Sequence, residues 1–378
     1  MKRPRKVPMN DLRRSYKLYQ DAIEYTVLDT LRSGIWLSGP HVTALESQMV
    51  AWLKVSDCVL VANGTDALEL AMQAILQIRK LRGREVITVA NAGGYATTAC
   101  RLNGLVPVYV DIETKSQLLS IPSAVGSLSD ATAFIVATHL YGGVIDVAKL
   151  RAAVDDAGFP EVAIIEDCAQ AHGARLDDQP VGSMGEIATF SFYPTKNLGA
   201  MGDGGAVVTS DAELAACVRE LRQYGWQVKY RVDRAGGRNS RMDEVQAAIL
   251  GVLLAHLPAS NAERIDIVSR YRKSAPEGLT FTEGGPGAVC HLAVARTARR
   301  DTLRAHLAER GIATDIHYPI LDCDQPGWRA LPMRFAPGGI PVSRQAVQEI
   351  LTIPCFTGMT ATEIEHVTTA LSDWHAVK

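Results

Sequence analysis

The stretch Ser191-Phe-Tyr-Pro-Thr-Lys196-Asn-Leu-Gly199 follows directly on an apolar run at residues 187–192 and precedes the glycine turn Gly202-Asp-Gly-Gly205. Because the apolar run predicts a strand, the sequence places a lysine just after a strand end. A second apolar run, at residues 162–165, leads into Glu166-Asp167-Cys-Ala-Gln170 and places a carboxylate at another strand end. Taken singly, a lysine here is usually a surface residue and an aspartate usually caps a turn.

Together, the lysine and the aspartate fit the chemistry of pyridoxal phosphate. The aldehyde of that cofactor condenses with an amine, and its pyridine nitrogen needs an anion to stay protonated so that the ring can withdraw electrons. Lys196 is the candidate amine, and Asp167 is the candidate anion. No metal site is predicted.

The rest of the chain predicts an α/β fold. Strand-like apolar runs occupy residues 58–62, 85–89, 106–110, 133–137, 162–165, 187–192 and 205–209, with helical segments between several of them. Short strands that are apolar nearly throughout predict a largely parallel sheet covered on both faces. In such a sheet ligands bind beyond the carboxyl ends of the strands, where Asn63, Asp167 and Lys196 fall.

The pattern changes after about residue 250. A helix is expected at residues 242–257, followed by a linking helix from Pro258, a strand at 291–295 and a helix at 299–310. We therefore predict a large domain at residues 1–250, including the N-terminal segment, and a smaller α+β domain at residues 251–378.

Other residues could hold the same cofactor. Gly64 and Thr65 open the first strongly apolar helix, at residues 65–76, and a helix N-terminus binds phosphate well. Ser191 would be a second phosphate ligand. Tyr95, just past a strand end, offers an aromatic face to the ring, and Gln170 could reach the ring hydroxyl. The simpler alternatives are an N-cap at Asn63 and a tyrosine that fills a loop.

Composition narrows the class of protein. The 378 residues carry a net charge of −2, which does not favour nucleic acid or an anionic membrane as partner. The seven cysteines form no Cys-x-x-Cys pair, so neither zinc nor a disulfide framework is predicted. No apolar stretch reaches the roughly twenty residues that span a bilayer, and we expect a cytoplasmic protein.

Four motifs make a family resemblance specific. The motifs and their order along the chain resemble the DegT/DnrJ/StrS family of sugar aminotransferases, and the similarity runs from about residue 7 to the end. The motifs are Asn63-Gly-Thr-Asp-Ala-Leu68, Glu166-Asp-Cys-Ala-Gln-Ala-His-Gly-Ala174, Ser191-Phe-Tyr-Pro-Thr-Lys-Asn-Leu-Gly199 and Asn239-Ser-Arg-Met-Asp-Glu-Val-Gln-Ala-Ala248.

The resemblance implies a pyridoxal phosphate enzyme of fold type I, similar in architecture to aspartate aminotransferase, that works as a homodimer with active sites built from both subunits. It implies that Lys196 binds the cofactor and moves protons, and that Asp167 pairs with the pyridine nitrogen. The remaining implied contacts are Gln170 to the ring oxygen, Gly64, Thr65 and Ser191 to the phosphate, and Asn239 to the phosphate of the neighbouring subunit's cofactor. Asn239 could instead cap the helix that follows.

The sequence departs from the family at one place. Many relatives carry the aromatic residue that stacks on the cofactor ring one position earlier, where this chain has Gly94. Tyr95 is given this role because it is the adjacent residue. The family also includes dehydratases with histidine in place of the lysine, and Lys196 argues against that branch.

The resemblance implies transfer of an amino group from glutamate to a nucleotide-linked keto sugar. Three segments resemble the branch that acts on dTDP-3-keto-6-deoxyhexoses: Tyr193-Pro194, Thr138-His-Leu-Tyr-Gly142 and Ile316-His317-Tyr318-Pro319. In the substrate site, Lys229, Tyr230 and Arg231 could contact the nucleotide diphosphate, and His317 and Tyr318 could face the sugar. Two alternatives stay open: a 4-aminotransferase acting on a UDP- or GDP-linked 4-keto sugar, and a regulatory protein that binds the cofactor without turnover.

Overall fold

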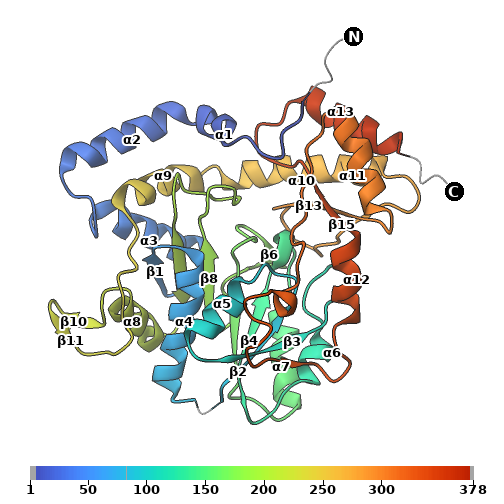
Figure 1. Cartoon of the computed structure of the whole chain (residues 1–378). Coiled ribbons are helices and arrows are strands. Elements are labelled where there is room, and N and C mark those ends of the chain that lie inside the picture. The colour runs from blue at the N-terminus through green and yellow to red at the C-terminus, as the bar shows by residue number, and fades with distance from the viewer. Residues whose placement is uncertain (1–5, 82, 375–378) are drawn as a thin grey trace.

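The computed structural model describes residues 6–81 and 83–374. Its centre is an eight-stranded sheet in the order β1-β9-β8-β5-β4-β2-β3-β14 (Figure 1). The strands of this sheet are β1 (Asp57–Val61), β2 (Glu85–Val89), β3 (Val106–Val110), β4 (Thr132–Thr138), β5 (Ala163–Asp167), β8 (Ile187–Ser191), β9 (Gly205–Thr209) and β14 (Arg334–Phe335).

The sheet is mixed, with a parallel majority. From β8 to β14 each strand runs parallel to its neighbour, whereas β9 runs antiparallel to both β8 and β1. The connection from β8 to β9 is the loop at residues 192–204, which contains no crossover helix. A loop without a crossover helix is compatible with an antiparallel neighbouring strand. The 192–204 loop also carries Lys196, near the carboxyl end of β8.

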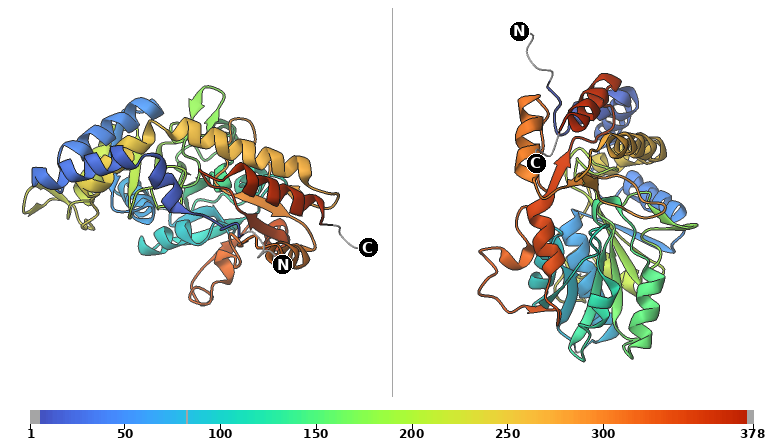
Figure 2. Two further views of the ribbon diagram at one scale, coloured as in Figure 1. Left: turned by 90° about the horizontal axis from the view of Figure 1, so that it is seen from above. Right: turned by 90° about the vertical axis from the view of Figure 1, so that its right-hand side faces the viewer.

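Helices cover both faces of the sheet (Figures 1 and 2). One face packs on α4 (Gly64–Arg79), α5 (Tyr95–Leu102) and α8 (Ala212–Leu221). The other packs on α3 (Pro40–Leu53) and α9 (Glu244–Leu254) at one end and on α6 (Ile121–Val125) and α7 (Val147–Asp156) at the other. Burial on both faces explains why the strands are apolar nearly throughout.

A smaller unit follows in the chain. Its three-stranded antiparallel sheet, in the order β12-β13-β15, joins β12 (Thr280–Phe281), β13 (Ala293–Arg296) and β15 (Ile350–Ile353). The helices of this region are α10 (Leu257–Ser274), α11 (Arg300–Glu309), α12 (Pro341–Glu349) and α13 (Ala361–Ser372). An apolar cluster between this sheet and its helices includes Tyr271, Phe356 and Trp374.

Two segments cross the predicted domain division at residue 250. At the N-terminus, Val7 bridges to Ile312, and Arg14 of α1 (Leu12–Leu18) donates to both carboxylate oxygens of Glu363 at 2.6 and 2.9 Å. In the other direction, β14 leaves the C-terminal region to pair with β3. The bend of 64° between α9 and α10 lies close to residue 250, and the division itself stays a prediction.

The remaining elements are short, apart from α2 (Gln20–Ser33). They are β6 (Arg175–Leu176), β7 (Gln179–Pro180), β10 (Trp226–Val228), β11 (Arg231–Val232), η1 (Leu140–Gly142) and η2 (Asp322–Asp324). The helix expected at residues 242–257 is shorter, since α9 ends at Leu254. The capping alternative for Asn239 is wrong, because Asp243 is the N-cap of α9.

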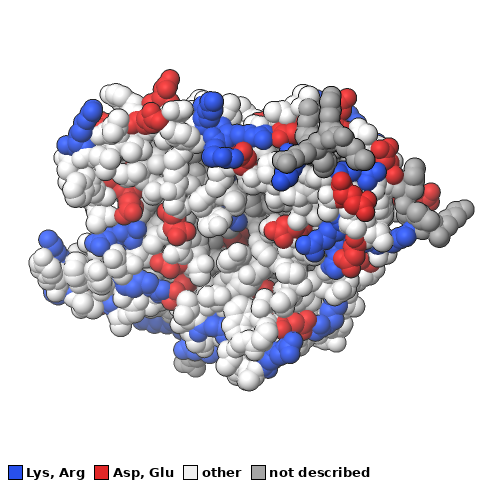
Figure 3. Space-filling view, turned by 45° about the horizontal axis from the view of Figure 1, so that its top comes forward, with Lys and Arg blue, Asp and Glu red and all other residues white. Residues whose placement is uncertain are grey.

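The surface shows no segregation of charge on the face seen in Figure 3, where basic and acidic side chains are interspersed between uncharged areas. Within the described residues, no single helix is long and apolar enough to cross a membrane. The bent pair of α9 and α10 passes that test jointly, by length and composition only.

Candidate active site

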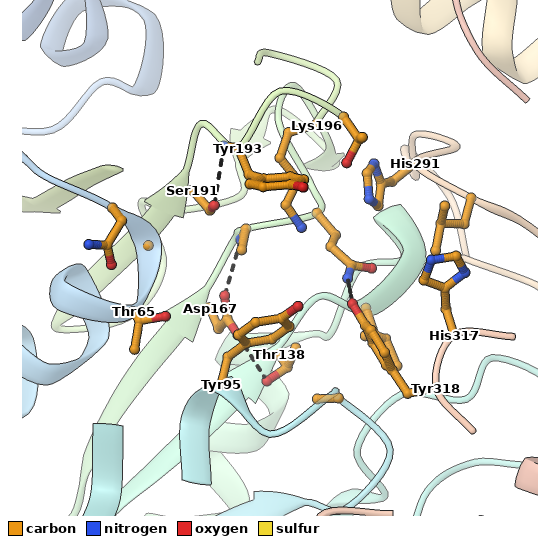
Figure 4. A pocket seen from close by; sticks show the side chains of 18 of the residues that line it. Thr65, Tyr95, Thr138, Asp167, Ser191, Tyr193, Lys196, His291, His317 and Tyr318 are labelled. Carbon is orange, nitrogen blue, oxygen red and sulfur yellow. Dashed lines mark hydrogen bonds between the residues drawn. The ribbon is translucent and has the colours of Figure 1, made fainter. Parts of the chain in front are cut away.

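A cavity of about 610 Å³ opens at the carboxyl ends of the large sheet's central strands, with the small unit forming its far wall. Nine of the thirteen predicted site residues line it: Gly64, Thr65, Tyr95, Asp167, Gln170, Ser191, Lys196, His317 and Tyr318. In Figure 4 the amine of Lys196 points into the middle of this space, with Ser191 and Thr65 on one side and His291 and His317 on the other. The structure therefore brings together residues from five distant stretches of sequence.

Lys196 reaches the cavity from the loop after β8. A turn in which the Lys196 N–H donates to the Tyr193 carbonyl at 2.8 Å holds the backbone. Burial of the amine lowers the pKa of Lys196 to about 8, although the nearby Asp167 carboxylate acts in the opposite direction. A larger share of the amine is consequently neutral near pH 7 than in a solvated lysine, as a nucleophile requires.

Asp167 is the last residue of β5 and is only 5 % exposed. Its Oδ1 accepts the N–H of Ala169 at 3.1 Å, and its Oδ2 lies 3.5 Å from the Thr138 hydroxyl. Burial raises the pKa of Asp167, against the opposing effects of the Ala169 N–H and of Lys196. A buried carboxylate with so few donors is suited to a protonated ring nitrogen, which would supply the missing cation.

The predicted phosphate cradle is formed by the start of α4 and the end of β8. Asn63 caps α4, its side chain accepting the Asp66 N–H at 2.8 Å. A Cβ built on Gly64 would lie 2.5 Å from Cβ and 3.0 Å from Oγ of Ser191. Glycine therefore allows the helix N-terminus and the Ser191 hydroxyl to face the same small space, an arrangement that fits a phosphate group.

Tyr95, Gln170 and Tyr318 form one wall of the cavity. Tyr95 is the first residue of α5 and is 47 % exposed, and its ring meets that of Tyr318 edge to face at 6.1 Å between centroids. Gln170 donates from Nε2 to the Tyr318 hydroxyl at 3.1 Å, while its Oε1 accepts the Tyr141 N–H at 2.8 Å. Figure 4 shows the Tyr95 ring beside Asp167, where a flat ring bound to that carboxylate would also lie.

The other four predicted residues lie elsewhere. Lys229, Tyr230 and Arg231 belong to the β10–β11 hairpin, at the opposite end of the molecule from the small unit in Figure 1. This hairpin is open to solvent, and Tyr230 is 77 % exposed. Asn239 is also exposed and does not line the cavity of its own chain. Within one subunit the hairpin residues do not line the cavity, and their contact with substrate stays a prediction.

Several residues that line or support the cavity were given no individual role from the sequence, although Thr138 and Tyr141 belong to a segment that resembles the family. Thr138 ends β4 beside Asp167, a position that the strand pattern could have flagged. Tyr141 supports the wall by donating from its hydroxyl to the His317 carbonyl. His291 and Arg264 come from the C-terminal region, and no local motif marks either of them.

A buried group behind the cavity has the residue types of a metal site. The ligand atoms of His139, Glu166 and Cys168 lie within 4.8 Å of one another. The Glu166 carboxylate, however, accepts N–H groups from Gly182, Met184 and Gly185 at 2.7 to 2.9 Å and lies 3.1 Å from His139 Nε2. Because the Glu166 oxygens and His139 Nε2 are already engaged within the protein, the group is explained as a buried hydrogen-bond network that supports β5.

Fold and cavity together define the class of protein: a fold-type-I enzyme that uses pyridoxal phosphate. Such an enzyme needs a desolvated lysine, a buried carboxylate and a helix N-terminus at one edge of a mainly parallel sheet. Comparison with known proteins is more specific. The DegT/DnrJ/EryC1/StrS aminotransferase family matches residues 18–372, and the chain belongs to this family.

Two relatives illustrate the similarity. The chain is 39 % identical over 370 residues to the erythromycin biosynthesis sensory transduction protein EryC1 of Saccharopolyspora erythraea, covering 97 % of this chain and 98 % of the relative. It is 35 % identical over 375 residues to dTDP-3-amino-3,4,6-trideoxy-alpha-D-glucose transaminase of Streptomyces venezuelae, covering 98 % and 96 %.

Solved structures agree with the fold and the cofactor. DesV of S. venezuelae, in complex with a ketimine intermediate, superposes with a TM-score of 0.91 at 35 % identity and 98 % coverage of both chains. NtdA of Bacillus subtilis with bound cofactor PMP gives a TM-score of 0.87 at 27 % identity, covering 97 % of this chain and 84 % of the other. The predicted fold and cofactor are confirmed, and the protein is a pyridoxal phosphate-dependent sugar-nucleotide aminotransferase.

Proposed function

We propose that the protein transfers the amino group of L-glutamate to a dTDP-linked 3-keto-6-deoxyhexose, giving a dTDP-3-amino-3,6-dideoxyhexose. One observation carries this proposal: the Lys196 amine points into a cavity that has the phosphate cradle on one side and the His317–Tyr318 wall on the other. The name of the S. venezuelae relative, a dTDP-3-amino sugar transaminase, supports the choice of nucleotide and of carbon 3.

The cofactor supplies an aldehyde that takes up the amino group and a ring that withdraws electrons. Lys196 Nζ would hold the cofactor at rest and would move the proton of the amino-bearing carbon in both half-reactions. The Asp167 carboxylate would face the ring nitrogen and would keep a proton on it. Gly64, Thr65 and Ser191 would bind the phosphate, and Tyr95 would pack against the ring.

The sugar would lie between Lys196 and the small unit. His317 Nδ1 is 2.9 Å from the Thr352 hydroxyl, which fixes the imidazole, and burial lowers the pKa of His317. The imidazole would therefore be neutral near pH 7 and would offer Nε2 to a sugar hydroxyl. Gln170 and Tyr318 share a hydrogen bond of 3.1 Å at the wall, so the orientation of one side chain depends on the other.

We propose further that the enzyme is a homodimer with shared active sites. Large apolar side chains are exposed along α2 and the segment after it, namely Tyr25, Leu28, Leu31, Ile35, Trp36 and Leu37, each 45 to 75 % exposed. Large exposed apolar side chains gathered on one segment are typical of an interface between subunits. In the dimer, Asn239 and the β10–β11 hairpin would reach the cavity of the neighbouring subunit.

Complementation tests the shared site. A Lys196→Ala subunit and an Asn239→Ala subunit are each expected to be weakly active alone, whereas mixed dimers should recover activity because one of their two cavities is intact. Light scattering on the same samples gives the oligomeric state. A fully active monomer would contradict this part of the proposal.

The alternatives differ in what they predict. A 4-aminotransferase would place the amino group on carbon 4, which the product's NMR spectrum distinguishes from carbon 3. The name of EryC1, a sensory transduction protein, favours keeping the regulatory alternative. A regulator without turnover would not transfer the amino group of glutamate, even with Lys196 in place.

The test begins with the visible absorption spectrum of the protein with pyridoxal phosphate, before and after L-glutamate. Wild type should show the band of the lysine-bound cofactor and lose it with glutamate, and a dTDP-3-keto-6-deoxyhexose should then restore it. Lys196→Ala should show no such band, whereas Lys149→Ala, which removes an exposed lysine on α7, should match wild type. A wild-type protein without the band would contradict the role of Lys196.

A further inference from the structure

His291 lines the cavity from the small unit, two residues before β13 begins. The residue is only 4 % exposed, and its ring lies between Lys196 and His317 in Figure 4. Its N–H donates to the Tyr141 carbonyl at 3.0 Å, and its carbonyl accepts from Arg264 Nη1 at 3.2 Å. The main chain therefore fixes where this imidazole lies.

A chain of hydrogen bonds links the ring to a main-chain carbonyl. Asn261 on α10 donates from Nδ2 to the His172 carbonyl at 2.8 Å, and its Oδ1 accepts from Asn197 Nδ2 at 2.8 Å. Asn197 Oδ1 lies 3.1 Å from His291 Nδ1. Because a carbonyl oxygen can only accept, it fixes the orientation of the Asn261 amide, which in turn fixes that of Asn197. Nδ1 of His291 therefore carries the ring proton.

The other ring nitrogen, Nε2, is then an acceptor only. A neutral imidazole carries a single N–H, and burial, together with the charges of Lys196 and Arg264, lowers the pKa of His291 well below its ordinary value. No described residue hydrogen-bonds to Nε2, which leaves this atom open to the cavity that His291 lines. The small unit thus presents a fixed acceptor to a ligand.

The chemistry of this acceptor selects the ligand group. An unprotonated nitrogen attracts a hydrogen-bond donor, whereas phosphate and carboxylate oxygens carry no hydrogen to donate. Asp315 lines the same cavity and adds a carboxylate, which accepts the Ile316 N–H at 2.8 Å. A sugar offers several hydroxyl donors. Since Asn197 is the residue after Lys196, the acceptor lies near the amine that acts at the keto carbon.

We propose that His291 binds a sugar hydroxyl that flanks the keto carbon of the substrate, and that Asn197 and Asn261 are positioning residues that hold His291 in the required tautomer. This inference rests on the proposed function, in which a keto sugar receives the amino group. By accepting that hydroxyl at Nε2, His291 sets the direction in which the sugar ring lies relative to Lys196. That direction decides which carbon is aminated.

Two substitutions separate the two ring nitrogens. His291→Gln keeps an acceptor oxygen near the position of Nε2, whereas His291→Asn keeps an amide N–H near Nδ1 and nothing at Nε2. Calorimetry on protein loaded with pyridoxal phosphate measures the binding of dTDP-6-deoxy-D-glucose, which has no keto group to react, of its 2-deoxy and 4-deoxy analogues, and of dTDP. His366→Asn, on α13 and outside the cavity, is the control variant.

We expect His291→Asn to weaken the binding of dTDP-6-deoxy-D-glucose about 3- to 10-fold, the effect of losing one hydrogen bond between uncharged groups. His291→Gln should retain most of the affinity. The analogue that lacks the bound hydroxyl should bind equally to wild type and to His291→Asn. The affinities for dTDP and pyridoxal phosphate should not change, and His366→Asn should match wild type.

The tautomer is measured directly in protein without cofactor or substrate. Nitrogen-15 NMR of protein labelled at its nine histidines distinguishes an Nδ1–H from an Nε2–H ring, and the signal missing from His291→Gln identifies His291. Wild type should show the Nδ1–H form. Asn261→Leu, which detaches Asn197 from the His172 carbonyl, should add the Nε2–H form. With pyridoxal phosphate bound, dTDP-6-deoxy-D-glucose should shift the Nε2 signal of wild type.

Several results would overturn the inference. If His291→Gln bound the sugar nucleotide more weakly than His291→Asn, the ring would serve only as a partner for Asn197. Equal losses with all three sugar nucleotides would exclude a flanking hydroxyl, and a loss for dTDP would place the diphosphate at His291. An Nε2–H ring in wild type would overturn the inference even in an active transaminase.

Failure of the proposed function gives a different result. A wild type that does not react with glutamate, but has the Nδ1–H ring and the shift of Nε2, would refute the transaminase reaction and leave the role of His291 intact. A wild type that does not bind the sugar nucleotide would refute both. If a variant does not fold, the tautomer of wild type and its response to the sugar nucleotide still decide.

Discussion

The desolvation of Lys196 leads to a quantitative prediction about cofactor loading. Burial lowers the pKa of this amine from its ordinary value of 10.5 to about 8. At pH 7 the neutral fraction is 1/(1 + 10^(8−7)), or about 9 %, compared with about 0.03 % for a lysine of pKa 10.5. Since only the neutral amine attacks an aldehyde, the cavity raises the reactive fraction about 300-fold.

The assay mixes protein freed of cofactor with pyridoxal phosphate and follows the band of the lysine-bound cofactor in a stopped-flow instrument between pH 6 and 10. The rate constant should rise about tenfold per pH unit below pH 7.5 and flatten above pH 8.5, because half of the amine is neutral near pH 8. Asp167→Asn should move the midpoint downward, since the carboxylate favours the protonated amine. Lys149→Ala is the control and should leave the profile unchanged.

A rate that continues to climb to pH 10 would refute the reasoning, because the amine would then titrate as a solvated lysine. An upward shift of the midpoint in Asp167→Asn would refute the electrostatic part alone. The two outcomes are separable because desolvation and the carboxylate act on the pKa of Lys196 in opposite directions.

Three further predictions concern the cradle and the fold. Gly64→Ala places a Cβ 2.5 Å from Ser191 Cβ, so equilibrium titration should show weaker binding of pyridoxal phosphate, with an overpacking cost of about 1–3 kcal/mol. Glu166→Gln loses a carboxylate that accepts three backbone N–H groups, and urea unfolding should show a loss of about 1–3 kcal/mol in the free energy of unfolding. Arg14 lowers the pKa of Glu363 from 4.5 to about 2, so their pairing stabilises the fold fully above pH 4.5 and is lost as pH falls towards 2. Arg14→Met should therefore raise the pH of half-unfolding in an acid titration followed by circular dichroism.

Much of the large sheet could be predicted because its strands are short apolar runs bounded by turn residues. The predictions at residues 85–89, 106–110 and 205–209 coincide with β2, β3 and β9. The direction of β9 could not be predicted, since an apolar run has the same appearance whichever way the strand points. A two-residue strand such as β14 leaves no pattern at all, and it forms because the C-terminal region packs against β3.

Residues that line the cavity could be predicted where they come directly after a strand. Residues that reach the cavity from elsewhere in the chain could not. The carboxyl ends of β5 and β8 meet at one edge of a parallel sheet, so Asp167 and Lys196 could be brought together on the strand pattern alone. Arg264 and His291 come from the part of the chain after residue 250. The bend between α9 and α10 and the packing of the small sheet bring them to the same cavity. Those are long-range contacts, and the local sequence around either residue is that of an ordinary helix or loop.

The charge of the cavity also bears on the oligomeric state. Of the described residues that line it, only Lys196 and Arg264 are lysine or arginine, and burial lowers the pKa of His291 and of His317. A cofactor phosphate together with either a nucleotide diphosphate or the carboxylates of glutamate brings more negative charge than these two cations offset. The exposed β10–β11 hairpin carries Lys229 and also Arg231, which pairs with the exposed-surface carboxylate of Asp233 at 2.8 Å. A second subunit that offers its hairpin to the cavity would supply the missing cations, and this charge argument supports the homodimer independently of the exposed apolar surface.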